Sequence, residues 1–288
     1  MFTGFKFCLN TSTLRGYKLP LREEIEIAAA AGYHAIEPWM SEIEAHENAG
    51  GTLEELASVV RDNGLSVQGA IGFFEWIVDD DARRAAALEQ ARRDMERVAR
   101  LGGTLIAAPP MGAVETSGLD LRRAAERYAA LCEVGRDCGV RPLVEVWGFS
   151  QTLSRLGEAA FIAAESGHRD ACILADVYHL HKGGSSHCGL ALFNGARLPL
   201  FHVNDYPADP PRESIKDEHR VWPGDGVAPL HAIFSTLHGI GFDGYLSLEL
   251  FNPNYWQGDA LETARTGLEK LQVALYTTEV ETNEGVAL

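Results

Sequence analysis

Eight short β-rich runs recur along this chain, and each is followed by a stretch rich in Ala, Leu, Glu and Arg with helical spacing. The expected strands are Phe5–Asn10, Ala35–Trp39, Ser66–Ile71, Thr104–Ala108, Leu143–Val146, Cys172–Asp176, Leu200–Asn204 and Tyr245–Leu250. The expected helices are Leu21–Ala31, Leu53–Asn63, Ala82–Leu101, Leu121–Cys138, Glu158–Ser166, a short one near His187–Asn194, Pro229–Gly239 and Ala260–Tyr276. Most strands begin about thirty to forty residues apart, the length of one strand–helix unit. This repeat restricts the chain to folds built from consecutive βα units.

Several of the expected strands are too apolar to alternate between buried and exposed positions, as is typical of parallel strands buried on both faces. Eight such units in 288 residues favour an α/β protein with one domain, a closed (β/α)8 TIM barrel over residues 1–278. An open, doubly wound sheet is the alternative, but no Gly-x-Gly-x-x-Gly follows the first strand to support dinucleotide binding. Residues 279–288 are expected to form an acidic C-terminal tail.

The charge balance is strongly acidic, with 41 Asp and Glu residues against 25 Lys and Arg and a formal net charge of −16. Nucleic-acid grooves need positive charge, so a DNA or RNA partner is disfavoured, and a phosphorylated substrate more weakly so. No run reaches the ~20 apolar residues of a bilayer span, and the first residues lack a signal-peptide pattern. The five cysteines include no Cys-x-x-Cys pair, which favours reduced thiols. We therefore expect a cytoplasmic protein with no membrane partner, and leave open whether it forms a homo-oligomer.

Four acid or imidazole side chains stand at the ends of consecutive expected strands: Glu145, Asp176, His202 and Glu249. In a (β/α)8 barrel the strand ends share one face, where catalysis takes place. A single buried carboxylate is usually an ion-pair or hydrogen-bond partner, but three near one point call for a balancing cation. The pattern predicts one divalent metal ion. Three oxygens and one imidazole suit Mn²⁺, Co²⁺, Zn²⁺ or Fe²⁺ better than Ca²⁺.

Four further motifs join the four strand ends. They are the opening Phe7-Cys8-Leu9-Asn10, Asp176-x-x-His179-x-His181, the stretch Asp217-Glu218-His219-Arg220-Val221-Trp222-Pro223-Gly224-Asp225-Gly226, and Ser247-Leu248-Glu249-Leu250-Phe251-Asn252-Pro253-Asn254-Tyr255. With these motifs the chain resembles, over nearly its whole length, the xylose isomerase-like TIM-barrel sugar isomerases and epimerases. Within that family it is most similar to the inosose (2-keto-myo-inositol) isomerase branch.

The resemblance implies that Glu145, Asp176, His202 and Glu249 bind the metal ion, and that Glu145 and Glu249 also act as the acid/base pair. It further implies that His179 holds a substrate hydroxyl and that Arg220 reaches the ligand from a long loop. Two positions depart from the pattern. Asn204 stands where relatives often have an acid, and Gln151 stands where the ketose 3-epimerase branch tends to have Glu.

The predicted activity is isomerisation of a neutral keto-sugar or inosose, with proton transfer through a metal-bound cis-enediolate. The metal would act as a Lewis acid, and one glutamate on each side of the substrate would remove and return the proton. An inosose dehydratase-type lyase and a ketose 3-epimerase remain alternatives on the same scaffold. An abasic-site endonuclease is disfavoured by the −16 charge, and a non-catalytic sugar-binding barrel by the intact ligand set.

The segment from Asp205 to Gly226 is longer than most loops in compact domains. We expect a lid whose Arg220 and Trp222 face the substrate, with a surface excursion or an oligomer contact as the alternative. Asp205 is expected to orient His202 or to lie in the shell around it. Glu37, at the end of the second strand, is expected to hydrogen-bond the substrate or the metal ligands, with an internal salt bridge as the alternative. The aromatic residues Trp39, Phe73, Phe74 and Trp76 could form an apolar wall of the pocket.

Overall fold

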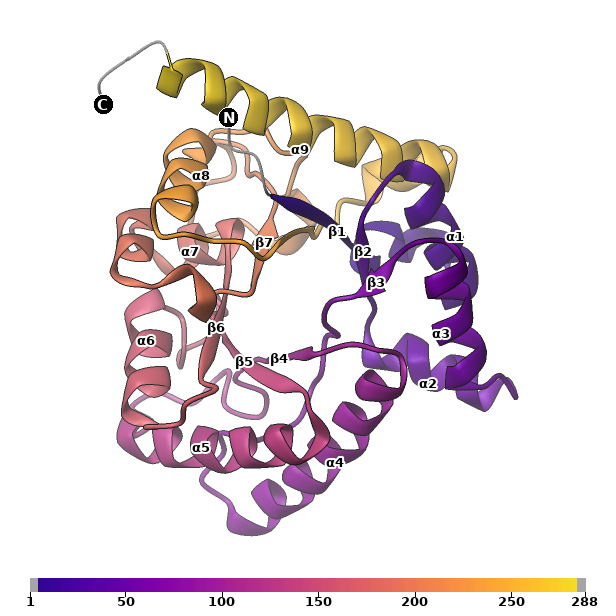
Figure 1. Ribbon diagram of the computed structural model, residues 1–288. Coiled ribbons are helices and arrows are strands. Elements are labelled where there is room, and N and C mark those ends of the chain that lie inside the picture. The colour runs from indigo at the N-terminus through magenta and orange to yellow at the C-terminus, as the bar shows by residue number, and fades with distance from the viewer. Residues whose placement is uncertain (1–4, 284–288) are drawn as a thin grey trace.

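Eight parallel strands alternate with helices along residues 5–283, the part of the chain that the computed structural model describes (Figure 1). The strands are β1 (Lys6–Asn10), β2 (Ala35–Glu37), β3 (Ser66–Val67), β4 (Leu105–Ala108), β5 (Arg141–Glu145), β6 (Cys172–Asp176), β7 (Leu200–Val203) and β8 (Tyr245–Leu248). The helices are α1 (Leu21–Ala31), α2 (Met40–Asn48), α3 (Leu53–Asp62), α4 (Asp81–Arg100), α5 (Leu121–Cys138), α6 (Leu156–Glu165), α7 (Val177–Gly183), α8 (Leu230–Gly239) and α9 (Ala260–Asn283). Five 3-10 turns join them: η1 (Thr11–Tyr17), η2 (His187–Leu192), η3 (Gly195–Arg197), η4 (Asp217–His219) and η5 (Pro253–Gln257).

The strands close into a barrel. Strand β1 pairs in parallel with both β2 and β8, so the first and last strands are neighbours. On the far side, the residues that follow β3 complete the ring through a bridge between Ile71 and Ala107. There Ala70 accepts a hydrogen bond from Ala107 N at 2.9 Å and donates one to Leu105 O at 3.2 Å. The predicted (β/α)8 barrel is therefore confirmed, and the open doubly wound sheet is excluded.

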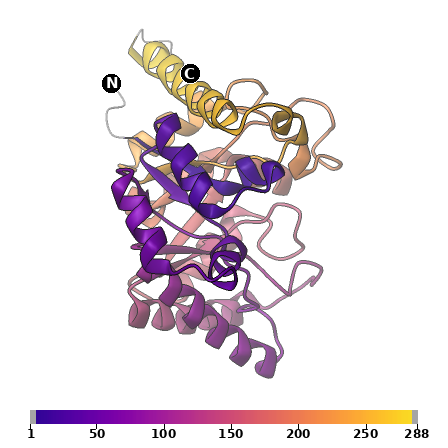
Figure 2. The same cartoon turned by 90° about the vertical axis from the view of Figure 1, so that its right-hand side faces the viewer.

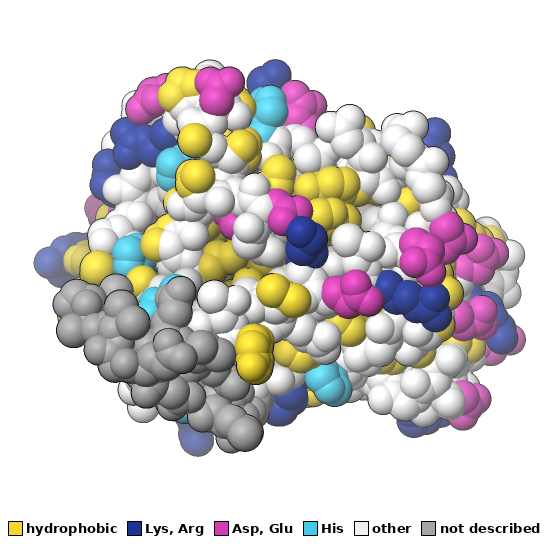
Figure 3. Space-filling model, turned by 90° about the horizontal axis from the view of Figure 1, so that it is seen from above, with side chains coloured by type: hydrophobic (Ala, Val, Ile, Leu, Met, Phe, Trp, Pro, Cys, Tyr) yellow, Lys and Arg dark blue, Asp and Glu magenta, His cyan; other side chains and the backbone are white. Residues whose placement is uncertain are grey.

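The helices surround the strands, and long connections project at one end of the barrel (Figure 2). Charged side chains of both signs are interspersed on the face shown in Figure 3. No helix among residues 5–283 has the length and hydropathy needed to cross a bilayer. Helix α9 packs against α1 and α8. Its backbone continues through residues 279–283, where we expected the acidic tail to begin, and residues 284–288 lie outside the described range. The division of the chain at residue 279 stays a prediction.

Two helices were not expected, and each starts at a strand end. Helix α2 begins directly after Trp39, and its Glu42 side chain accepts a hydrogen bond from Trp39 N at 2.9 Å. Helix α7 begins directly after Asp176, whose Oδ1 accepts from His179 N at 2.9 Å. Both helices are too short to show a clear apolar period, so only the capping side chain marks their start. The helix expected near His187–Asn194 is only the 3-10 turn η2.

Side chains alternate between the inside and the outside of the barrel along each strand. The inner layer includes Leu143 of β5, Cys172 and Leu174 of β6, and Leu200 of β7, which form one apolar cluster. The same alternation, with a period of two residues, puts the acid and imidazole side chains on the inner side as well, at the carboxyl end of the strands. These residues are Glu145, Asp176, His202 and Glu249. The barrel interior therefore changes from apolar to polar and charged within one step along the strands.

Candidate metal centre and active site

Asp176, His202 and Glu249 form a buried cluster at the carboxyl end of the barrel. Asp176 ends β6, His202 is its register partner on β7, and Glu249 follows β8. One ligand atom from each lies within 4.8 Å of the others, and the three side chains are buried. Two carboxylates and one imidazole at this spacing could hold a divalent metal ion.

His202 is oriented from behind by Glu37. The Nε2 atom of His202 lies 3.0 Å from Glu37 Oε2, which also accepts hydrogen bonds from Asn10 Nδ2 at 2.9 Å and Ser247 Oγ at 2.7 Å. The Nδ1 atom lies 3.2 Å from Glu249 Oε2 and 3.9 Å from Asp176 Oδ2. Burial acts against protonation of the ring, but Glu249 and Glu37 outweigh it and hold the pKa of His202 well above its usual range in the absence of a metal ion. In the neutral ring, a proton on Nε2 facing Glu37 would leave the Nδ1 lone pair for a metal ion. Histidines that bind metals are usually supported in this way.

Four buried atoms in the site have no hydrogen-bond partner within the described chain: His202 Nδ1, Glu145 Oε2, Glu37 Oε1 and Arg220 Nε. Buried polar atoms normally find a partner, so such orphans need an explanation. A divalent cation bound at the cluster would supply a partner for His202 Nδ1 and would balance the charge of the buried carboxylates. The residues present therefore fit a metal ion.

Glu145 stands beside the three-residue cluster and outside its 4.8 Å group. It is buried and lines the same cavity as Glu249. Burial raises the pKa of Glu145 to about 8. Burial also acts against ionisation of Glu249, but His202 and Arg220 outweigh it and hold the pKa of Glu249 well below its usual range. Without a metal ion, one glutamate of the pair is therefore protonated near neutral pH and the other is ionised. Two carboxyl groups held apart in this way are suited to acid and base roles.

Arg220 brings a cation into the cluster. Its Nη1 atom donates to Asp176 Oδ2 at 3.0 Å and to Glu249 Oε2 at 2.8 Å, and Nη2 donates to Asp217. The guanidinium is 1 % exposed, and Asn252 Nδ2 holds the Arg220 carbonyl at 2.9 Å. Such a buried, multiply paired arginine offsets the charge of two carboxylates.

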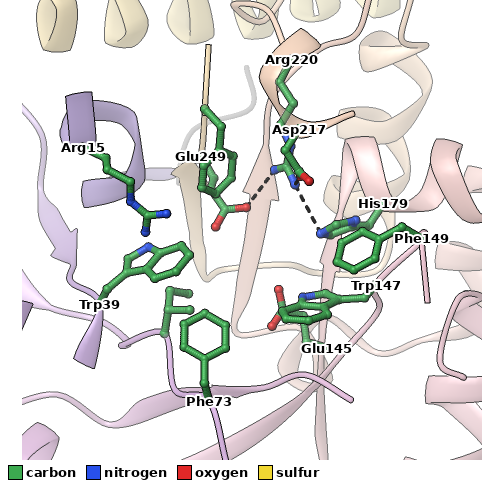
Figure 4. A pocket seen from close by; sticks show the side chains of 12 residues that line it. Arg15, Trp39, Phe73, Glu145, Trp147, Phe149, His179, Asp217, Arg220 and Glu249 are labelled. Atoms are coloured by element: carbon green, nitrogen blue, oxygen red, sulfur yellow. Dashed lines mark hydrogen bonds and ion pairs between the residues drawn. The ribbon is translucent and has the colours of Figure 1, made fainter. Parts of the chain in front are cut away.

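His179 presents a polar edge next to Arg220. Its Nδ1 atom accepts a hydrogen bond from Gly148 N at 3.3 Å, which places the ring proton of the neutral form on Nε2. The Nε2 atom lies 3.3 Å from Arg220 Nη2 (Figure 4), and because a guanidinium can only donate, a proton on Nε2 needs an acceptor other than Arg220. Burial lowers the pKa of His179. The ring is therefore a neutral donor at the edge of the cavity.

A cavity of about 380 Å³ opens above these residues. This is within the size range of small-molecule sites. Figure 4 shows aromatic rings on its walls around Glu145 and Glu249. The lining residues are Arg15, Trp39, Ile71, Phe73, Glu145, Trp147, Phe149, His179, Asp217, Arg220, Glu249 and Phe251. A polar, reactive end enclosed by aromatic faces suits a sugar, because its C–H faces pack on rings while its hydroxyls reach the polar groups.

Two residues, Trp222 and Asp205, lie elsewhere than expected, and Glu37 makes one of its expected contacts. Trp222 does not line the cavity; it is stacked on Tyr255 at a ring distance of 4.1 Å, and only Arg220 of the pair faces inward. Glu37 is buried behind His202 and does not line the cavity, and its hydrogen bond to this candidate metal ligand is one of the contacts expected of it. Asp205 does not orient His202. Its carboxylate instead accepts hydrogen bonds from four backbone N–H groups of its own loop.

The aromatic wall is only partly the expected one. Trp39 and Phe73 line the cavity, whereas Phe74 and Trp76 are fully buried in the core. Sequence reasoning gave no role to Asn10, the last residue of the opening motif, which bridges Glu37 and Glu249 from the end of β1. Asn10 is the register partner of Glu37, so counting inward positions along β1 would have found it.

Comparison with known proteins agrees with this architecture. Residues 25–273 match the family model described as xylose isomerase-like TIM barrel. Inosose isomerase of Bacillus licheniformis is 29% identical over 282 residues, covering 92% of this chain and 95% of that protein. Inosose isomerase of Bacillus velezensis is 27% identical and covers 94% and 97%. A crystal structure described as IOLI protein with a binding zinc atom superposes with a TM-score of 0.86 at 22% identity, covering 95% of this chain and 99% of that chain.

The fold and the buried Asp-His-Glu cluster thus define a TIM-barrel enzyme with a candidate metal site. The chain belongs to the xylose isomerase-like TIM barrel family, the group of the sugar isomerases and epimerases.

Proposed function

We propose that this enzyme is a divalent-metal-dependent isomerase of an inosose or a similar neutral keto-sugar. One observation carries the proposal. The buried cluster of Asp176, His202 and Glu249 lies beside Glu145 in an aromatic cavity, in a chain that matches inosose isomerases over more than nine-tenths of its length. The ion is Mn²⁺, Co²⁺, Zn²⁺ or Fe²⁺, and the zinc of the IOLI structure supports Zn²⁺ as the first to be tested.

Asp176, His202 and Glu249 would hold the ion, with Glu145 as a fourth ligand if its side chain turns toward them. The ion would supply Lewis-acid polarisation of the substrate carbonyl. Glu145 and Glu249 would then carry out the proton transfer, because both carboxyl groups line the cavity and their proton affinities differ. Moving a carbonyl to the neighbouring carbon needs one group to take the proton from that carbon and one to return it.

The other polar residues would position the substrate. His179 would donate a hydrogen bond from Nε2 to a substrate hydroxyl, and Arg220 would stabilise negative charge that develops on a substrate oxygen. Asp217, which binds Arg220 Nη2, would keep the guanidinium in place. The aromatic walls would exclude water from the reacting carbons.

The test is proton exchange in D2O. The purified enzyme is stripped of metal, reloaded separately with Zn²⁺, Mn²⁺ or Co²⁺, and incubated with 2-keto-myo-inositol. We expect deuterium to enter the carbon next to the carbonyl, and EDTA to abolish this uptake. No uptake from any inosose or ketose with any of these metals would refute the proposal.

Product analysis of the same reaction separates the related activities. An isomerase moves the carbonyl, an epimerase inverts one carbon, and a lyase releases water and leaves an unsaturated ketone. The matched relatives include a 3-dehydro-D-guloside 4-epimerase of Escherichia coli, 26% identical over 212 residues and covering 68% of this chain and 76% of that protein. Inverted product without carbonyl migration would move the assignment to an epimerase.

A further inference from the structure

Arg15 is a second arginine of the cavity, and the roles above do not use it. It lies on η1, directly after β1, and its side chain is exposed at the cavity. In Figure 4 Arg15 enters from one side, over the indole of Trp39, and Arg220 enters from the other, with Glu249 between them. Within the described chain the Arg15 guanidinium makes no hydrogen bond and no ion pair closer than 4 Å, whereas Arg220 is bound to Asp176, Asp217 and Glu249.

One face of the Arg15 guanidinium lies over an aromatic ring, and a second ring lies further away. Its central carbon lies 3.6 Å from the ring centre of Trp39 and 5.4 Å from that of Phe251. A cation over an aromatic face is attracted by the ring. The N–H donors of a guanidinium lie at the edge of its plane, so this edge is the part of Arg15 that can bind a ligand.

The platform under Arg15 is itself fixed. Trp39 Nε1 donates to Asn10 Oδ1 at 3.1 Å, and Asn10 in turn donates to Glu249 Oε1 at 3.2 Å. Thr13, two residues before Arg15, accepts a hydrogen bond from Leu250 N at 3.2 Å through its hydroxyl. The orientation of the arginine edge is thus tied to the backbone that carries Glu249.

We infer that Arg15 and Trp39 form a second subsite that binds two adjacent oxygens on the part of the substrate remote from the metal cluster. This inference rests on the proposed function, and it names the substrate class more narrowly: a cyclic polyol ketone with neighbouring hydroxyls on its far edge. The planar fork of a guanidinium presents two parallel donors, which match two adjacent oxygens. The ring of the substrate would lie along the aromatic walls between the subsite and Glu145.

A three-carbon ketose that binds the metal cluster through its carbonyl and one hydroxyl has only one hydroxyl left, so it cannot offer Arg15 two adjacent oxygens. A six-membered polyol ring has further neighbouring hydroxyls and can use both subsites. Arg15 is a specificity residue in this scheme, and it takes no part in proton transfer.

Two variants test the inference. Arg15→Met keeps an unbranched stem over Trp39 but loses every donor, and Arg15→Lys keeps the charge but loses the fork. The matched control is Arg61→Met, at an exposed arginine of α3 whose side chain hydrogen-bonds only Ser58 among residues 5–283. For metal-loaded Arg15→Met we expect kcat/KM for 2-keto-myo-inositol to fall at least tenfold, mainly through KM, and exchange of dihydroxyacetone to change less than twofold. Arg15→Lys should lie between wild type and Arg15→Met, and the control should match wild type.

Calorimetric titration with myo-inositol provides a readout besides turnover, because this polyol has the hydroxyls but no carbonyl. Its affinity should fall at least tenfold in Arg15→Met. Wild-type activity on inosose with unchanged KM and myo-inositol affinity in Arg15→Met would overturn the inference and leave the proposed function standing. Equal losses for inosose and dihydroxyacetone would also overturn it, as would a wild-type preference for a carboxylated ring over the neutral one. Absence of exchange with every ketose in the wild type would instead refute the proposed function.

Discussion

Asp205 organises the loop that delivers Arg220, and its removal is the sharpest test of how this site is built. Oδ1 accepts hydrogen bonds from Tyr206 N at 2.7 Å and Ala228 N at 2.8 Å. Oδ2 accepts from Gly224 N at 3.0 Å and Gly226 N at 3.1 Å. The backbone of Asp205 also pairs with Val221, one residue beyond Arg220. A single buried carboxylate therefore holds together both ends of the loop that carries Arg220.

Asp205→Ala removes the acceptor for four backbone N–H groups. At a net ~1 kcal/mol for each hydrogen bond the loss would be about 4 kcal/mol, and rehydration of the exposed Gly224 reduces it to roughly 3 kcal/mol. A domain of this size loses ~2–4 °C of melting temperature per kcal/mol, so we expect Tm to fall by roughly 6–12 °C. Asp205→Asn retains one oxygen and turns an amide toward two of the donors, so it should lose at least half as much.

The assay combines thermal unfolding with the exchange reaction. Because the loop carries Arg220, kcat/KM should fall at temperatures at which the Asp205→Ala protein is still folded. Glu218→Ala, an exposed acid of the same loop, is the control and should leave both quantities unchanged. An Asp205→Ala enzyme with Tm within 1 °C of wild type and full activity would refute the view that this carboxylate holds the loop.

Three further predictions concern buried charges. Glu145→Gln and Glu249→Gln should each lower deuterium exchange at least ~100-fold. Glu145→Gln should still bind metal by calorimetry, and near-normal turnover in both variants would contradict the acid/base assignment. Arg220→Met should lower the Tm of the metal-free protein, because it leaves two buried carboxylates without their cation. Added Zn²⁺ should reduce the difference in Tm between this variant and wild type. An equal difference in Tm with and without metal would count against this prediction. Burial raises the pKa of Glu24 in the folded protein to about 9. Between the pKa of this carboxyl group in the unfolded chain and about 9, the folded protein therefore binds one more proton than the unfolded chain does. The free energy of unfolding should accordingly decline as pH rises from about 5 to 9. Urea unfolding of Glu24→Gln should show a smaller decline over this range, and parallel curves would refute it.

The barrel could be predicted because its signal is repeated eight times. Each strand–helix unit adds the same evidence, and errors at single boundaries do not change the fold. The strand-end residues could be predicted for a related reason. Burying an acid or a histidine at the end of an apolar strand costs free energy unless the side chain is paired or binds a ligand. Asp176 and His202 stand out in this way without any knowledge of their neighbours.

What sequence reasoning could not give is the direction in which residues on irregular segments point. Arg220 and Trp222 are two positions apart in one loop, yet Arg220 enters the cluster while Trp222 stacks on Tyr255. The role of Asp205 depends on backbone N–H groups up to 23 residues away in the chain. Such contacts are set by the conformation of the loop, and a loop sequence has no hydrophobic periodicity from which its conformation could be predicted.

The side chains behind the metal cluster have a consequence for assembly of the barrel. Asn10 of β1 reaches Glu249, and Glu37 of β2 reaches both Ser247 of β8 and His202 of β7. These contacts cross the seam where the beginning of the chain meets its end. A high-affinity cation site should therefore exist only after the first forty residues have docked onto β7 and β8. Metal affinity during refolding would thus report the moment at which the ring closes.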